Sequence, residues 1–300
     1  MTTKLSPSEQ LAYSTVRIEC ELVNEQIGTG TGFFFRFAED EEMHVPAIVT
    51  NKHVVSGAKK GKFIMTLADA NGAPTQQSHH GFLFDNFESM WVPHPDKDID
   101  LCAMPIAPLL EAAKKESKQL FYISLDKSLI PSKAEYEDMV LMEEITMVGY
   151  PNGIWDEVNN MPIFRRGITA THPNLNWNGK PEFLIDAACF PGSSGSPVFL
   201  YNQVGYATKS GGMTIGPGRL KLLGVLYAGP QHTVSGEVKI VTVPTQNIPI
   251  AVSSIPNNLG IVIKATQLEA FESFFKKVIE NGKTANKAPQ PTPKSGAAEL

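Results

Sequence analysis

The sequence contains few cysteines. Cys20, Cys102 and Cys189 are the three in 300 residues, and each lies in an apolar segment. An odd number of thiols in apolar surroundings is typical of reduced core residues and not of a disulfide framework. We therefore expect the fold to depend on its hydrophobic core, as in a protein of a reducing compartment.

Long apolar runs and a positive net charge are also missing. No stretch approaches the roughly 18 apolar residues that a membrane helix needs, and residues 1–16 lack the apolar segment of a secretory signal. The net charge of −5 gives no basic surface for nucleic acid or an anionic membrane. These absences predict a cytoplasmic protein that binds neither nucleic acid nor membrane.

Motifs for cofactors are lacking as well. The glycine-rich stretch 28–32 (GTGTG) does not end in the Gly-Lys-Ser/Thr of a phosphate loop. His79 and His80 have no third metal ligand at a recognisable spacing. We expect no cofactor and no metal.

The chain does contain many short runs with the character of β-strands. Val16, Ile18, Cys20 and Leu22 alternate with polar residues, which is the period of a half-buried strand. Further apolar or β-branched runs are 31–37, 47–50, 62–67, 145–148, 183–187, 222–227, 239–243 and 260–263. Because Gly, Pro and Asn separate these runs, they predict an all-β fold of barrels or sandwiches.

Two segments have helical character. One is 109–120, and the clearer one is 266–282, where Thr266 and Glu269 form a capping-box pattern and Gly282 can end the helix. Residues 283–300 have no large apolar side chain before the last position, so we expect a disordered tail.

The strongest local signal for chemistry is the hexapeptide 192–197 (GSSGSP). A serine hydroxyl is a weak nucleophile without a base beside it and donors for the oxyanion. Small neighbours let the backbone expose the Ser194 hydroxyl and turn the N–H groups of Gly192 and Ser194 toward one point. Alone, the hexapeptide is equally consistent with an ordinary turn.

A candidate base and a candidate carboxylate occur earlier in the chain. A β-like run brings His53 to a short polar bend. Asp98 and Asp100 stand at the start of an apolar strand, where a buried carboxylate needs a partner such as an imidazole N–H. Aligning the apolar run favours Asp100, and Asp98 is the alternative.

The chain order His53, Asp100, Ser194 is that of the chymotrypsin arrangement, and differs from that of subtilisin or the α/β-hydrolases. The sequence also resembles the trypsin-like peptidases, especially their bacterial high-temperature-requirement (Deg) branch, over about residues 14–265. The likeness runs through 30–33 (GTGF), 50–55, 100–106, 148–151 (VGYP), 167–168, 186–188, 224–229 and 260–263.

The resemblance implies a fold and a division of the chain. The fold is all-β, with two packed antiparallel six-stranded β-barrels and a C-terminal helix. The implied units are an N-terminal segment (1–13), a first barrel with His and Asp (14–125), a second barrel with Ser (126–265), a helix (266–282) and a tail (283–300).

The resemblance also implies roles for single residues. His53 is the general base, Asp100 orients it, and Ser194 is the nucleophile, while the N–H groups of Gly192 and Ser194 stabilise the oxyanion. The implied S1 pocket has Ala188 at its base and is lined by Phe190, Tyr227, Ala228 and Gly229. Since no carboxylate stands at that base, we expect cleavage after small or medium apolar P1 residues and not after Lys or Arg.

The sequence also departs from its relatives, for example at Ser196, where a second glycine is usual. Secreted digestive relatives carry an aspartate before the nucleophile that pairs with a newly cleaved N-terminus, whereas this chain has Ser193 there. We therefore expect activity without N-terminal cleavage. We expect no PDZ domain after residue 265, so the tethering of substrates in the Deg branch is not carried over.

The predicted function is a serine endopeptidase that acts on polypeptides through an acyl-enzyme, and no oligomeric state is predicted. A non-catalytic trypsin-like module that binds peptides is one alternative, although no triad member is missing. The other is a protease gated by a partner, with the glycine-bearing stretch 205–218 as the mobile element.

Overall fold

The computed structural model describes residues 5–23, 25–39, 43–216, 218–229, 231–235, 252–256 and 258–285. The acidic residues 40–42, the strand expected at 239–243 and residues 286–300 of the expected tail lie outside this part of the chain.

The N-terminal half is an antiparallel sheet of eight strands in the order β5-β4-β1-β2-β3-β7-β6, with β8 paired to β4. The strands are β1 (Thr15–Leu22), β2 (Ile27–Phe37), β3 (Val45–Thr50), β4 (Ala58–Ala68), β5 (Pro74–Asp85), β6 (Val92–Pro93), β7 (Cys102–Pro105) and β8 (Leu120–Phe121). This half thus differs from the expected six-stranded barrel: within the described residues no pairing joins β5 to β6. With two residues, β6 is too short to continue the ladder around the sheet.

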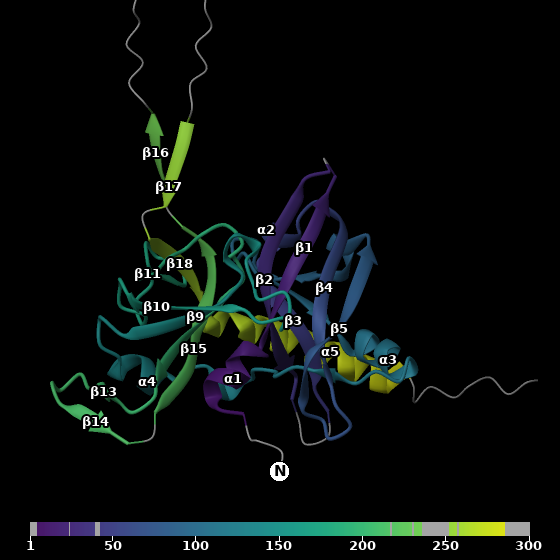
Figure 1. The fold of residues 1–300 in the computed structure, drawn as a ribbon. Helices are drawn as coiled ribbons and strands as arrows, with labels where there is room; N and C mark the ends of the chain where they lie inside the picture. Colours follow the sequence, from purple (N-terminus) through teal and green to yellow (C-terminus); the bar gives the residue numbers. More distant parts are fainter. Residues whose placement is uncertain are drawn as a thin grey trace, which may run out of the picture.

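The C-terminal half is a closed barrel of six strands in the order β10-β11-β18-β15-β12-β9, as expected. Its strands are β9 (Glu144–Gly149), β10 (Ile163–Thr169), β11 (Glu182–Asp186), β12 (Pro197–Asn202), β15 (Arg219–Ala228) and β18 (Leu259–Lys264). Two further antiparallel pairs, β13–β14 (Gly205–Ala207 and Met213–Ile215) and β16–β17 (Gln231–Ser235 and Val252–Pro256), extend from it (Figure 1). The all-β class is confirmed.

Short helices connect the strands. They are α1 (Pro7–Ala12), α2 (Lys52–Val55), α3 (Ala107–Lys115), α4 (Lys133–Asp138) and α5 (Glu269–Ala285), with 3₁₀ turns η1 (Phe87–Met90), η2 (Lys127–Leu129), η3 (Pro151–Gly153) and η4 (Ala265–Leu268). None of these helices combines the length and the apolar character that a bilayer crossing requires.

The C-terminal helix is present, but it begins differently from the expectation. The capping box at Thr266 and Glu269 does not form, because the chain enters through the 3₁₀ turn η4, whose N-cap Lys264 makes no side-chain cap. Helix α5 then continues past Gly282 to Ala285. By contrast, Ser6 and Glu9 form a complete capping box at α1, a helix that the apolar pattern did not predict.

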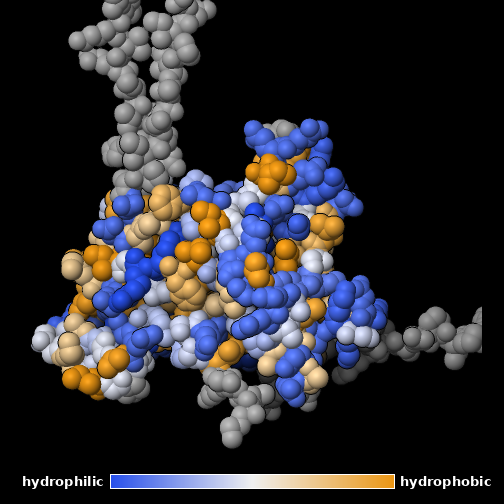
Figure 2. Space-filling view, in the orientation of Figure 1, coloured by the Kyte–Doolittle hydropathy of each residue, from blue (hydrophilic) through white to orange (hydrophobic). Residues whose placement is uncertain are grey.

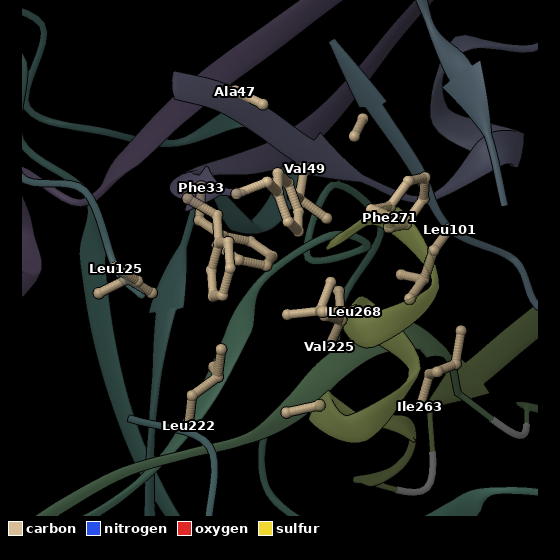
Figure 3. Packing of buried hydrophobic residues seen from close by; sticks show 14 of the residues in the cluster. Phe33, Ala47, Val49, Leu101, Leu125, Leu222, Val225, Ile263, Leu268 and Phe271 are labelled. Carbon is tan, nitrogen blue, oxygen red and sulfur yellow. The ribbon is translucent and has the colours of Figure 1, made fainter. Parts of the chain in front are cut away.

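One hydrophobic cluster holds the two halves together. It joins Phe33 and Val49 of the first sheet to Leu222 and Val225 of the barrel, and Phe271 of α5 packs into it (Figure 3). The ring centroids of Phe37 and Phe271 are 5.7 Å apart. Burial of such side chains contributes roughly 1.5–3 kcal/mol each. Helix α5 therefore fixes the barrel that it follows against the sheet that opens the chain.

All three cysteines are buried free thiols, in agreement with the expectation of reduced core residues. Burial raises the pKa of Cys20 to about 12 and that of Cys189 to about 11. Since the thiolate is the reactive form, neither side chain is a competing nucleophile at neutral pH.

The β13–β14 hairpin exposes apolar side chains on β14. Met213 and Ile215 are 70% and 78% exposed, and orange atoms mark this region at the lower left of Figure 2. The stretch 205–218, proposed as the mobile element of a gated protease, thus contains a two-stranded antiparallel ribbon.

Candidate active site

The ends of two paired strands bring His53 and Asp100 together. Strand β3 ends at Thr50 and β7 begins at Cys102, and these two residues face each other in an antiparallel ladder. His53 comes three positions after the end of β3, on the single-turn helix α2, and Asp100 comes two positions before β7. Because one strand of an antiparallel pair ends where its partner begins, both side chains lie at the same edge of the sheet, where β3 ends and β7 begins.

The two residues form a two-point contact. His53 Nδ1 lies 2.5 Å from Asp100 Oδ2, and the backbone N–H of His53 donates to Asp100 Oδ1 at 3.1 Å. An ionised carboxylate can only accept, so in the neutral imidazole the ring proton lies on Nδ1 and the lone pair on Nε2. Asn51 Nδ2 donates to the carbonyl of Asp100 at 2.7 Å and holds the backbone behind the carboxylate.

Asp98 does not take part in this contact. Its side chain is exposed, and its backbone N–H donates to Asp96 Oδ1 at 2.9 Å. Of the two carboxylates that the sequence left open, Asp100 is the one paired with His53.

Ser194 lies on the loop between β11 and β12, beside the end of β15. Its half-buried hydroxyl donates to the carbonyl of Tyr227 at 3.3 Å. Two further bonds, from Gly195 N to Leu226 O at 2.8 Å and from Leu226 N to Ser196 O at 3.0 Å, fasten the loop to β15. The positive φ of Gly195, +86°, and the carbonyl of Thr31 in the space of a side chain explain the glycine after Ser194.

Thr31 connects the serine loop to the histidine strand. Its N–H donates to Ser194 O at 2.8 Å, and its hydroxyl donates to Gly192 O at 3.0 Å. Its own carbonyl accepts from the hydroxyl of Thr50 at 2.7 Å. Through this one buried residue of β2, the nucleophile loop of the second half is held at the edge that contains His53.

The hydroxyl of Thr31 is therefore expected to contribute to stability. Thr31→Val keeps the shape but leaves Gly192 O and Tyr150 N, which donates to Thr31 Oγ1 at 3.1 Å, without that partner. We expect a loss of about 2–6 kcal/mol in the free energy of unfolding, measured by urea denaturation, because each of the two buried orphans costs about 1–3 kcal/mol.

Thr15→Val is the matched control for this substitution. The hydroxyl of Thr15 is buried and has no hydrogen-bond partner, so removing it should leave stability unchanged or slightly higher. Equal losses in the two variants would contradict the role given to Thr31.

The two N–H groups predicted for the oxyanion hole have no acceptor among the described residues. Within the described residues, neither the N–H of Gly192 nor that of Ser194 donates a hydrogen bond. Gly192 has φ +82°, and a Cβ there would lie 2.7 Å from the carbonyl of Tyr150. Only glycine fits this conformation without strain, which leaves both donors open to an acceptor.

The side chain of Tyr227, whose carbonyl contacts Ser194, is held by Glu182. Its hydroxyl donates to Glu182 Oε1 at 2.9 Å. Burial raises the pKa of Tyr227 far above its usual range, and the negative charges of Glu182 and Asp100 raise it further.

The residues predicted for the S1 pocket lie around the serine loop. Phe190 is 39% exposed. A Cβ added at Gly229 would lie 3.1 Å from Leu259 O and 3.7 Å from the Cβ of Cys189. Ala228 is the last residue of β15. The partly buried Tyr227 ring packs against the core between the two halves, and its carbonyl accepts from Ser194.

Arg165 of β10 contacts this loop, and the sequence analysis missed it. Its Nη1 donates to Ala188 O at 2.6 Å and to Ser193 Oγ at 2.8 Å. Burial lowers the pKa of Arg165 to about 10. A signal was present: 165 and 166 are consecutive arginines in a strand, whose side chains must point to opposite faces.

Solved structures with some likeness to the chain have low identities. The HtrA-type protease AlgW with tripeptide is 15% identical with a TM-score of 0.46, covering 91% of this chain and 62% of that one. Deg5 is 20% identical with a TM-score of 0.40, covering 75% and 88%. The active form of the Rv3671c protease from M. tuberculosis is 14% identical with a TM-score of 0.41, covering 94% and 85%. The chain thus spans 62% of the length of the AlgW chain.

Comparison with sequence families gives a clearer result. No curated protein matches the chain. The family described as trypsin-like peptidase domain matches residues 30–205, which is more than half of the chain and includes His53, Asp100 and Ser194. The chain belongs to the trypsin-like peptidase family.

Proposed function

We propose that the protein is a serine endopeptidase that hydrolyses peptide bonds through His53, Asp100 and Ser194. The observation that carries the proposal is the contact of 2.5 Å between His53 Nδ1 and Asp100 Oδ2. This contact leaves the Nε2 lone pair of His53 available as a base, at the edge to which Thr31 ties the Ser194 loop.

The chemistry begins with a turn of one side chain. The Ser194 hydroxyl, which donates to Tyr227 O, rotates toward His53 Nε2. Nε2 accepts the proton as Oγ attacks the peptide carbonyl, and the imidazolium then protonates the leaving amine. A water molecule, deprotonated by the same nitrogen, hydrolyses the acyl-enzyme and frees Ser194. Asp100 stabilises the imidazolium and keeps the ring in the required tautomer.

The tetrahedral intermediate is stabilised by backbone donors. The N–H groups of Gly192 and Ser194 have no acceptor of their own within the described residues, and both flank Ser193. Donors that are fixed before the reaction need no reorganisation when negative charge develops, and each contributes about 10²–10³ in rate.

The predicted preference for small or medium apolar P1 residues has electrostatic support. Ala188, at the predicted base of the pocket, adds no carboxylate, and the guanidinium of Arg165 donates to its carbonyl. A Lys or Arg side chain at P1 would approach this cation without a counter-charge, which disfavours its entry.

Digestion of a denatured proteome tests the proposal. We expect the wild type to produce internal cleavages after Ala, Val or Leu, identified by mass spectrometry of the new termini, and Ser194→Ala to produce none. Frequent Lys, Arg, Asp or Glu at P1 would contradict the specificity. Equal binding of peptides by both proteins, without cleavage by either, would instead favour the non-catalytic binding module.

The alternative in which a partner gates activity has one observation in its favour. The β13–β14 hairpin exposes Met213 and Ile215 on β14. If a partner gates the activity, the pure wild type should react weakly with a fluorophosphonate probe and cleave peptides slowly. Casein cleavage by the pure protein at a rate equal to that of trypsin would contradict it.

A further inference from the structure

We infer that Arg165 is a positioning residue that holds the loop 188–193 in the shape required by the oxyanion donors, in place of any cleaved N-terminus. The inference rests on the proposed peptidase function. Arg165 contacts neither the triad nor the open N–H groups; it acts through Ala188 and Ser193.

Arg165 forms hydrogen bonds with two residues of the loop. A single nitrogen, Nη1, donates to Ala188 O at 2.6 Å and to Ser193 Oγ at 2.8 Å. The same hydroxyl accepts from Phe190 N at 3.3 Å, and Ser193 N donates to Phe190 O at 3.0 Å. Ser193 is thus the point at which side-chain and backbone bonds of the loop meet.

The contact with Arg165 bears on the oxyanion donors because of the position of Ser193 in the chain. Ser193 stands between Gly192 and Ser194, whose N–H groups are the two open donors. Its side chain is 1% exposed, so it is enclosed where Arg165 reaches it. The peptide plane between Ser193 and Ser194 contains the Ser194 N–H, so a change in the backbone at Ser193 turns that donor directly, and the Gly192 N–H belongs to the same loop. Losing the contact to Arg165 should therefore misdirect the donors while His53, Asp100 and the Ser194 hydroxyl stay in place.

The electrostatics explain why the loop and the arginine depend on each other. Arg165 takes part in none of the ion pairs of the described residues, and its Nε and Nη2 are buried without hydrogen-bond partners. A buried cation is costly unless it is compensated. The compensation visible here comes from one carbonyl and one hydroxyl of the loop, so the cation stabilises the loop conformation that offers them.

This arrangement accounts for the serine before the nucleophile. A hydroxyl cannot form the ion pair that an aspartate at this position makes with a new N-terminal ammonium in secreted relatives. The cation here comes from β10, within the barrel, and is present as soon as the chain folds.

Arg165→Met tests the inference, with Arg166→Met as the matched control. Arg166 is the adjacent residue of β10, is exposed, and pairs with Glu144 at the surface at 2.8 Å. For a fluorogenic peptide with leucine at P1, we expect Arg165→Met to lower kcat about 10²-fold, as for loss of one oxyanion donor, with little change in KM. Arg166→Met should match the wild type, and Arg165→Lys should recover part of the rate.

A leucine peptide aldehyde separates positioning from general damage. It forms a tetrahedral adduct whose oxygen needs the donors, so its inhibition constant should rise as kcat/KM falls, whereas the affinity of the corresponding peptide amide should not change. Parallel weakening of aldehyde and amide, or no weakening of the aldehyde, would overturn the inference.

Hydrogen exchange of the loop gives a readout that does not depend on activity. Peptides covering 188–196 should exchange faster in Arg165→Met than in Arg166→Met, and unchanged exchange would overturn the inference even if the wild type hydrolysed nothing. In that event the proposed function would fail separately, in the wild type and the control alike. If Arg165→Met loses its cooperative melt, Ser193→Ala, which keeps the cation, should show the same pattern with about a tenfold fall in kcat.

Discussion

Replacing Ser194 with alanine is expected to lower kcat about 10⁶-fold, because no other group then forms the acyl-enzyme. The fold should persist, since the Ser194 hydroxyl makes one hydrogen bond, to Tyr227 O at 3.3 Å at the half-buried end of β15. The measurement is kcat on a peptide amide, with thermal melting in parallel. Ser89→Ala, at an exposed serine of η1, should leave both quantities unchanged.

His53→Ala should reduce kcat to a similar level, and the double variant should fall little further. The nucleophile and its base act as a unit, so their separate losses are not additive. His44→Ala, at an exposed histidine, is the control. A rate in Ser194→Ala within tenfold of the wild type would contradict the role of Ser194.

Replacing Asp100 with asparagine is expected to lower kcat about 10⁴-fold. The amide can donate to His53 Nδ1, which favours the tautomer with the proton on Nε2, where it cannot accept the serine proton. Shape and hydrogen-bond capacity are almost preserved, so stability should change little. The measurement is kcat at saturating substrate.

Asp98→Asn is the internal comparison for Asp100→Asn. Asp98 is exposed and lies two positions away in the same segment, outside the contact with His53. We expect its kcat to stay within about twofold of the wild type, which is the scale of a change in a surface charge. A larger fall for Asp98→Asn than for Asp100→Asn would overturn the assignment of the carboxylate.

The positions of His53 and Asp100 were predictable because both follow from local patterns. Each stands beside an apolar run, and the chain order His53, Asp100, Ser194 together with the resemblance to trypsin-like peptidases linked the two. The sequence left Asp98 and Asp100 open. The register in which Thr50 faces Cys102, together with the bond from Asn51 to Asp100 O, distinguishes them, and neither is encoded in a single segment.

The topology of the first half was less predictable. Strand β4 pairs with β1, β5 and β8, and such a choice of neighbours depends on tertiary packing and not on β-propensity. Individual strands were therefore anticipated, while the count of eight and the open order were not.

Arg165 shows a different limit. Consecutive arginines guarantee that one points inward, but the register of β10 against β9, in which Arg165 faces Met147, decides which. The capping pattern at Thr266 failed for a related reason: η4 begins directly after β18, and the chain direction imposed by that strand overrides the local capping preference.

Covalent labelling with a fluorophosphonate probe tests the central claim most directly, because the probe reacts with a serine only where a base and oxyanion donors activate it. Our account predicts one adduct per native chain, found on Ser194 by tandem mass spectrometry of the labelled peptide, absent in Ser194→Ala and greatly slowed in His53→Ala. An unlabelled native wild type, or an adduct that persists in Ser194→Ala, would contradict it.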